Sequence, residues 1–419
     1  MGFLLDVLES IKPSAKELKD ELEVANRLVE HIKLHVPPSC EVALTGSIAK
    51  KTFLRDKKDV DIFVLFPRSE PKEHLESKIK EIMESAFPSI GYQISYAEHP
   101  YIRFHYHGRK VDLVPAYKIS KAAERLSAVD RSVLHTRFVR NSLKLGQTDE
   151  VLLLKQFLKA NSLYGAEIKT KGFSGYLCEL LIVKYGTFRK LAAAASRWKS
   201  VFIDIKKFYS SREAKEQQKR LGVFVVIDPT DKNRNVAAAV SEKNFKKFIS
   251  LCRSFVKKPD KKFFLYAPKS FEQKLKAASR GKKLFLLSMP RPDVVDDVLW
   301  GQIHKLTKQL KDHLKDFEPS SIPADDSRHV VRIAIILKKD HLPKKMLIQG
   351  PPLSMEKNVS DFRKSHGKAR FTKKNKKIYA EIRRPVTKAE QAIMAFFRSF
   401  SKTRSHLAYP EEIIILERK

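Results

Sequence analysis

Two carboxylates stand at the start of a strongly apolar segment, Asp59 and Asp61, with the apolar run at residues 62–66 behind them. Side chains two positions apart on a β-strand point to the same side, so both carboxylates are predicted to face one point. Burying two like charges is costly unless a cation joins them. Hard oxygen ligands suit magnesium, and this pair therefore predicts a Mg²⁺ site.

A third carboxylate, Asp112, interrupts another β-branched pattern at residues 110–115. Taken alone, Asp112 does not identify a functional site. Upstream, Gly46 permits a close approach of the backbone, and Ser47 is predicted to begin a short helix whose N-terminus receives phosphate. The order of a Gly-Ser turn, an Asp-x-Asp pair and a later strand aspartate is much more specific than any one of them.

A small α/β domain is predicted to hold these residues. The capping box formed by Ser14 and Glu17 predicts a first helix, because the two side chains satisfy backbone N–H groups that have no partner within a helix. Strand-like runs follow at 42–45, 60–66, 93–97, 102–106 and 110–114, and they predict a mixed sheet that ends near residue 120. We assign residues 1–124 to this catalytic head.

The middle of the chain, residues 125–257, is predicted to be helical. Apolar residues recur at helical spacing from Phe245 to Phe255, and shorter helices are expected near 151–161 and 174–185. The polar stretch at 257–262 contains a proline among four lysines, and it predicts a linker.

The last third is predicted to form an RNA-recognition-like or ferredoxin-like body with the order β-α-β-β-α-β. Its strands are expected at 284–289, 329–337, 378–382 and 413–416, and its helices at 293–317 and after the Thr387-x-x-Glu390 capping box. The body then spans 258–339 and 377–419, with an insertion at 340–376 between its second and third strands. The cations singled out in this insertion are Arg363, Lys364, Lys368, Arg370, Lys373, Lys374 and Lys376. Such a charge run is either a solvated surface or a tail that binds RNA.

Composition favours a nucleic-acid partner. The 419 residues include 83 Lys and Arg against 48 Asp and Glu, and a net charge of +35 attracts polyanions by steering and counterion release. A high-salt or thermophilic surface, or binding to a membrane surface, would also account for this charge. The three cysteines are far apart, and no stretch is long and apolar enough to cross a bilayer. We expect a cytoplasmic protein without disulfides.

Several ordered motifs resemble those of the archaeal, class I, CCA-adding enzymes, within the DNA polymerase beta-like nucleotidyltransferase superfamily. The resemblance covers nearly the whole chain. It rests on strings that include Thr45-Gly46-Ser47-Ile48-Ala49-Lys50, Ala97-Glu98-His99-Pro100-Tyr101, Val111-Asp112-Leu113-Val114-Pro115, Lys171-Gly172-Phe173-Ser174-Gly175-Tyr176 and Asp228-Pro229-Thr230-Asp231-Lys232-Asn233-Arg234.

This resemblance implies an α+β multidomain protein with a polymerase beta-like head, a helical neck, the ferredoxin-like body and an inserted basic tail that holds tRNA. It implies a homodimer that uses ATP and CTP. Asp59, Asp61 and Asp112 match the family's metal ligands, for two Mg²⁺ ions. The positions that match its nucleotide contacts are Gly46, Ser47, Lys50, His135, Lys155, Tyr164 and Arg234, of which Arg234 matches the residue that reads the base. Lys50 replaces the family's usual arginine.

Two other functions remain open from the sequence. A poly(A) polymerase or oligoadenylate synthase-like enzyme of the same superfamily would add adenylate tracts and ignore CTP. A non-catalytic RNA-binding relative would keep the basic body and tail. Three convergent acids favour an enzyme over the second alternative, because simple RNA binding does not need them.

Overall fold

The computed structural model describes residues 2–96, 100–265 and 270–400, together with residues 407, 410 and 412–416. Ala97, Glu98 and His99 lie outside the described residues, so the end of the strand expected at 93–97 and the first half of one family motif are not described. The chain divides into two compact units, Met1–Pro268 and Lys269–Lys419. The expected head and neck thus form one unit.

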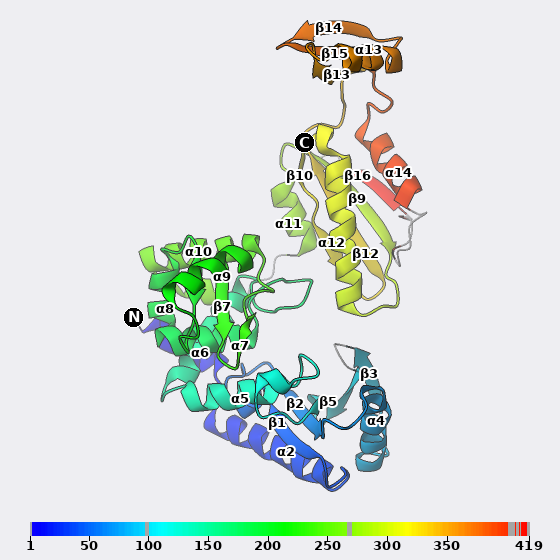
Figure 1. The fold of residues 1–419 in the computed structure, drawn as a ribbon. Coiled ribbons are helices and arrows are strands. Elements are labelled where there is room, and N and C mark those ends of the chain that lie inside the picture. The colour runs from blue at the N-terminus through cyan, green and yellow to red at the C-terminus, as the bar shows by residue number, and fades with distance from the viewer. Residues whose placement is uncertain are drawn as a thin grey trace. The chain divides into compact units, whose positions relative to one another are not determined.

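A five-stranded mixed sheet forms the head, in the order β1-β2-β5-β4-β3 (Figure 1). The strands are β1 Glu41–Thr45, β2 Asp59–Phe66, β3 Tyr92–Tyr96, β4 Pro100–Tyr106 and β5 Arg109–Tyr117. Strands β2 and β5 pair in parallel, and the other neighbours in this sheet pair antiparallel. The head helices are α1 Phe3–Ile11, α2 Ala15–Lys33, α3 Gly46–Ala49 and α4 Leu75–Ala86, with short 3-10 turns η1 Lys72–His74 and η2 Ala122–Glu124.

Both faces of strand β2 are covered, which explains its unbroken apolar run. Ile62 and Val64 pack in a core with residues of α2 and α4, whereas Phe63 and Leu65 pack with Val133 on the opposite face. Val133 belongs to α5 Arg131–Ser142. Asp59 and Asp61 are odd-numbered like Phe63, so alternation along the strand places them on the face that α5 covers. The capping box of α2 is present as predicted.

The neck contains the expected helices and also a small sheet that the sequence analysis did not predict. Its helices are α5, α6 Gln147–Ala160, α7 Gly175–Tyr185, α8 Phe188–Ala195, α9 Ser211–Leu221 and α10 Glu242–Lys257. The sheet has the order β6-β7-β8, from Val201–Ile203, Phe224–Asp228 and Asp231–Asn235. Apolar runs this short cannot be distinguished from buried helix by periodicity.

The neck extends beyond the linker expected at 257–262. Residues Lys261–Phe264 form the 3-10 turn η3, and Phe264 is buried in the neck core beside Phe157. The side-chain amide of Gln156 donates to the Phe264 carbonyl at 2.6 Å. The neck therefore extends past the boundary expected at residue 257. Phe263 and Phe264 follow the lysines and attach this segment to the neck core.

The second unit contains an antiparallel sheet in the order β10-β12-β9-β16. Its strands are β9 Lys283–Pro290, β10 Pro319–Ser321, β11 Ala324–Asp326, β12 Val330–Leu337 and β16 Glu412–Leu416. Helices α12 Asp296–His313 and α14 Ala389–Phe400 contribute to a core on one face, and α11 Phe271–Ala278 packs in a separate cluster with Leu284 and Ile336. The turn η4 Lys315–Phe317 follows α12.

The order β-α-β-β-α-β is present, but two of its strands were assigned wrongly. The second strand is the short β10, and the third is β12, which the sequence analysis took as the second. The segment expected at 378–382 is β15 Lys377–Arg383, which pairs with β13 Lys345–Pro352 and β14 Arg370–Lys374 in a sheet of its own. The period of two in β15 shows a half-buried strand, but it cannot show which sheet the strand joins.

The tail therefore lies between β12 and α14, and it includes β15. Its elements are β13, α13 Glu356–Ser365, β14 and β15. At its base the Leu342 backbone N–H donates to the Thr387 carbonyl at 2.8 Å, and His341 forms a β-bridge with Lys388. The insertion thus extends well past the expected end at residue 376.

Candidate functional site

Asp61 and Asp112 lie on the adjacent parallel strands β2 and β5. In the register of β2 and β5, Asp61 stands opposite Asp112, and Asp59 stands opposite Lys110. Asp61 and Asp112 therefore share one face of the sheet although they are far apart in the sequence. Parallel pairing of two central strands is what converts separate acidic residues into one site.

The backbone conformation at position 46 and its close contact with Asp61 require a glycine. Its φ is +68°, and a Cβ atom built there would lie 1.8 Å from Oδ2 of Asp61. A side chain at this position would therefore displace the carboxylate, in addition to the strain of a left-handed backbone. Ser47 follows at the start of the short helix α3, and Ile48 anchors that helix in the head core.

Burial and like charge act together on Asp61. Burial, with further repulsion from Asp112 and Asp59, raises the pKa of Asp61 from 3.8 to about 6, against the attraction of Lys50 and Lys110. A carboxyl group held in this way is costly to ionise without a nearby cation. Because the donors are carboxylate oxygens, the site suits a hard divalent ion.

Asp112 forms an ion pair with Arg103. Nε and Nη2 of Arg103 donate to its two carboxylate oxygens at 2.7 and 2.9 Å, and this contact raises the pKa of Arg103. In the described part of the chain, no group of three or more acidic, histidine or cysteine side chains is arranged to hold a metal. The three acids suit magnesium by type and position, and Asp112 keeps further carboxylate lone pairs beside the two that accept from Arg103.

A buried ionic cluster joins the head to the neck beside these acids. Glu179 is fully buried, and its carboxylate accepts from the Lys50 ammonium and the Thr52 hydroxyl, each at 2.6 Å. Lys155, also buried, lies 3.6 Å from Glu179 and donates to the Thr52 carbonyl at 2.6 Å. Burial alone would raise the pKa of Glu179, but the two lysines and Thr52 lower it below its ordinary value.

A second buried acid organises the far end of the site. Asp228 accepts from the Tyr176 hydroxyl at 3.0 Å and from Nη1 of Arg234 at 2.8 Å, and Nε2 of His135 lies at 2.8 Å. Burial would raise the pKa of Asp228, but His135, Thr230 and Arg234 lower it strongly. Burial also lowers the pKa of His135, against the opposing effect of its contact with Asp228. Nε2 of His135 is the donor in this contact, because an ionised carboxylate can only accept hydrogen bonds.

Tyr176 connects the two clusters. Its ring stacks on His135 with centroids 4.1 Å apart, and the Lys50 ammonium lies 5.9 Å from its centre. Lys50, Lys155, His135 and Arg234, expected from the family resemblance, are thus brought into one continuous network. Tyr164 is close to it, since a Cβ on Gly175 would meet both the Tyr164 hydroxyl and the Lys155 ammonium within 3.6 Å.

Sequence reasoning missed Glu179, Asp228, Tyr176, Thr52 and Arg103 as site residues. A signal existed for Glu179, which is the lone acid within the apolar helix α7. Asp228 likewise ends the apolar strand β7. An acid inside an apolar run is costly unless it has a partner, and this cost is itself a sign of function.

The tail cations lie on one small exposed subdomain, but they do not share one face. Arg363 and Lys364 end α13, Arg370, Lys373 and Lys374 belong to β14, and Lys376 lies in the turn that follows. Alternation along β14 separates Lys373 from Arg370 and Lys374. A cavity of about 410 Å³ is lined by Lys344, Lys345, Lys368, Arg370, Glu381, Ile382 and Arg383. Three of its cations, Lys344, Lys345 and Arg383, were not among the residues singled out.

Comparisons with known proteins match this architecture. Family models match as a nucleotidyltransferase domain over residues 25–135, a tRNA nucleotidyltransferase second domain over 149–265 and a CCA-adding enzyme C-terminal domain over 280–406. A structure of the Cid1 poly(U) polymerase is similar in fold, with a TM-score of 0.50 and 15% identity, over 63% of this chain and 98% of that one. The fold and the acidic site define a nucleotidyltransferase.

Curated relatives narrow the family. The CCA-adding enzyme of Methanocaldococcus jannaschii is 38% identical over 87% of this chain and 84% of its own length. The CCA-adding enzymes of Methanosarcina mazei and Archaeoglobus fulgidus are 36% and 34% identical, over 92% and 95% of this chain and 87% and 89% of their own lengths. The chain belongs to the family of CCA-adding enzymes. Within its described residues, no helix has the length and hydropathy needed to cross a membrane.

The raised pKa of Asp61 predicts a gain in metal-free stability when its charge is removed. A carboxyl group whose pKa is raised by folding costs stability as pH rises from 3.8 through about 6, so Asp61→Asn should stabilise the protein in EDTA at pH 8 by up to roughly 3 kcal/mol. The gain should be smaller at pH 5. Thermal unfolding at both pH values, with the exposed Asp20→Asn as control, measures this effect. Equal gains at both pH values would contradict the proposed cause.

Glu179 is predicted to be essential for joining the head and the neck. Glu179→Gln leaves Lys50 and Lys155 without their buried counter-charge, and breaking a buried ion pair on one side costs about 3–5 kcal/mol. Urea unfolding at pH 7 gives the free energy of unfolding. The matched control is Glu242→Gln, whose exposed pair with Lys246 should matter little. A similar small change in both variants would show that the buried cluster does not stabilise the unit.

Proposed function

We propose that this chain adds C, C and A in sequence to the 3′ end of tRNA, from CTP and ATP and without a nucleic-acid template, with release of pyrophosphate. The main support for the proposal is the register of the parallel strands, which sets Asp61 opposite Asp112. Gly46 and the lysines Lys50 and Lys155 lie beside this pair. Membership of the CCA-adding family supplies the substrate class.

Asp59, Asp61 and Asp112 are the proposed ligands of two Mg²⁺ ions. Bound magnesium would activate the 3′-hydroxyl of the RNA and neutralise charge on the triphosphate. The protein's own part is to present the carboxylates on a rigid sheet and to exclude side chains at Gly46. Arg103 pairs with Asp112 at 2.7 Å and so fixes the position of this carboxylate.

Ser47 and Lys50 are the proposed contacts of the triphosphate. His135, Lys155 and Tyr164 are proposed as further nucleotide contacts. Lys50 stands where the family usually has arginine, and an ammonium is a point charge without a bidentate fork. Glu179 compensates in part, because it fixes the position of the Lys50 ammonium at 2.6 Å. A phosphate would therefore meet an ammonium group that is already ordered, with little further loss of side-chain entropy.

Arg234 is the proposed reader of the base, and Asp228 holds it in place. Cytosine and adenine both present an amino donor beside an unprotonated ring nitrogen, whereas uracil and guanine present a carbonyl beside a ring N–H. A guanidinium at the ring nitrogen therefore accepts C and A and leaves U and G with clashing donors. Nη1 of Arg234 donates to Asp228 at 2.8 Å, and the proposal assigns other N–H groups of the same guanidinium to the base.

The tail is proposed to bind the tRNA backbone by shape, because A-form RNA presents phosphates and 2′-hydroxyls more readily than base edges. Its exposed cations and the cavity lined by Lys344, Lys345, Lys368 and Arg370 support this role. Assembly as a homodimer and a cytoplasmic location stay predictions from the sequence and the family.

The central test is incorporation of labelled CTP and ATP into a tRNA that lacks its CCA end. We expect two cytidylates followed by one adenylate. Asp112→Ala should abolish addition while gel-shift binding of tRNA stays nearly intact, because the carboxylate holds metal and does not bind RNA. Long adenylate tracts without use of CTP would indicate a poly(A) polymerase, and efficient extension by Asp112→Ala would reject the assigned acids.

Arg234→Ala is predicted to lower incorporation of both CTP and ATP, by about 10- to 100-fold for the loss of charged hydrogen bonds, and to narrow their advantage over UTP and GTP. Steady-state incorporation of all four nucleotides measures the change. Lys232→Ala removes an exposed charge from the same hairpin and should preserve the discrimination. If Arg234→Ala keeps the discrimination of the parent protein, the base is read elsewhere.

A further inference from the structure

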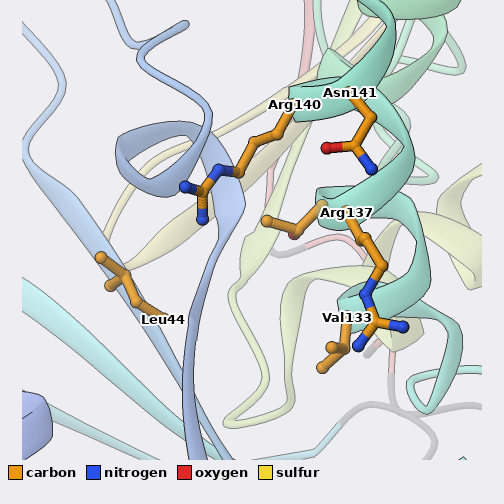
Figure 2. Close-up of a pocket in the computed structure, with 6 residues that line it drawn as sticks. Leu44, Val133, Arg137, Arg140 and Asn141 are labelled. Atoms are coloured by element: carbon orange, nitrogen blue, oxygen red, sulfur yellow. The ribbon is translucent and has the colours of Figure 1, made fainter.

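A cavity of about 230 Å³ lies between helix α5 and β1, an edge strand of the head sheet. Its lining residues are Leu44, Val133, Thr136, Arg137, Arg140 and Asn141. Figure 2 shows the side chains of Arg137, Arg140 and Asn141 extending from α5, with Leu44 across from them. The lining thus combines cationic and polar side chains of α5 with the apolar residues Val133 and Leu44.

This cavity is distinct from the candidate active site. Val133, Arg137 and Arg140 are spaced i, i+4 and i+7, so they share one face of α5. His135 lies on the other side of the helix, where Nε2 is 2.8 Å from Asp228. One helix therefore presents one face to the nucleotide network and another face to the cavity.

The two arginines of the cavity are not neutralised. Both are exposed, and within the described chain neither guanidinium group has a hydrogen-bond or ion-pair partner. Other arginines of the same unit are paired with carboxylates, for example Arg103 with Asp112 and Arg109 with Glu21. No acidic side chain is among the described residues that line the cavity. Two unpaired guanidinium groups beside one cavity favour an anion, and their planar forks suit phosphate oxygens.

The volume and the lining residues of the cavity indicate which kind of anion it would bind. At about 230 Å³ the cavity is smaller than the roughly 300–1,000 Å³ of pockets that enclose a small-molecule ligand, which favours a single phosphate group over a whole nucleoside triphosphate. One phosphate of a polynucleotide could enter while the rest of the strand stays outside. Leu44 and Val133 offer an apolar surface to a ribose, and the Asn141 amide can donate to or accept from a sugar hydroxyl.

We propose that this cavity binds a backbone phosphate of the RNA substrate through Arg137 and Arg140. The identity of the RNA rests on the proposed function, but the preference for a phosphodiester does not. Because α5 carries His135 on its other face, the same helix would place a bound RNA strand relative to the incoming nucleotide. The site would add affinity without sequence preference, since it contacts the backbone alone.

The test is equilibrium binding of a tRNA that lacks CCA to the full chain, without nucleotides, over a series of salt concentrations. The double variant Arg137→Ala, Arg140→Ala should bind more weakly, and the slope of log affinity against log salt should flatten by roughly 0.7–0.9 for each phosphate that the variant no longer binds. KM for CTP should be unchanged. The variant Arg137→Lys, Arg140→Lys keeps the charge and should recover part of the affinity.

The matched control is the double variant Arg189→Ala, Lys190→Ala, which removes two exposed cations from α8. Thermal unfolding of each variant verifies the fold. If the α5 variant loses no more affinity or slope than this control, the site does not exist. A rise in KM for CTP with unchanged RNA affinity would overturn the assignment to RNA. Because binding is measured without catalysis, failure of CCA addition would be seen separately.

Discussion

The candidate active site depends on one buried carboxylate, Glu179 of α7. It holds Lys50 and Thr52 of the head and lies beside Lys155 of α6, so it joins parts of the chain that are far apart in sequence. Buried charges are tolerated only with well-placed partners, and the cluster meets that condition with two ammonium groups and a hydroxyl around one anion. The position of Lys50 beside Asp61 is therefore set by a helix of the neck.

The same helix places the other end of the site. Tyr176 and Glu179 are three residues apart on α7 and so lie on one side of it. Glu179 fixes the lysines near the carboxylates, while the Tyr176 hydroxyl donates to Asp228, which in turn holds Arg234. The distance between the Lys50 cluster and the Asp228–Arg234 pair is thus set by one turn of helix α7.

The cationic side chains fall into two groups. Some are paired with carboxylates of the protein, and others remain exposed to solvent. Arg103, Arg109 and Arg234 each contact a carboxylate, and these contacts order the head and the neck. Arg137 and Arg140 beside β1, and most cations of the inserted tail, remain exposed. Since unpaired cations release counterions when they meet phosphate, this second group is where affinity for RNA is expected to arise.

The sequence by itself determined the elements and the chemical types of the site. The Asp59-x-Asp61 pair, the turn at Gly46 and the helix capped at Ser14 follow from local patterns, because alternation, left-handed backbone and capping are properties of a few neighbouring residues. The sequence motifs around Lys50 and Arg234 indicated the CCA-adding family. These signals predicted the head sheet and the positions of its acids closely.

Only the tertiary structure decided which distant residues meet. The pairing of Asp112 with Arg103, the cluster around Glu179 and the role of Asp228 arise from contacts between separate elements, and no local pattern encodes the partner of a buried charge. Strand β15 joined the tail sheet instead of the body for the same reason. A strand's period of two shows that it has a buried face, but the packing of the whole unit selects the sheet that it completes.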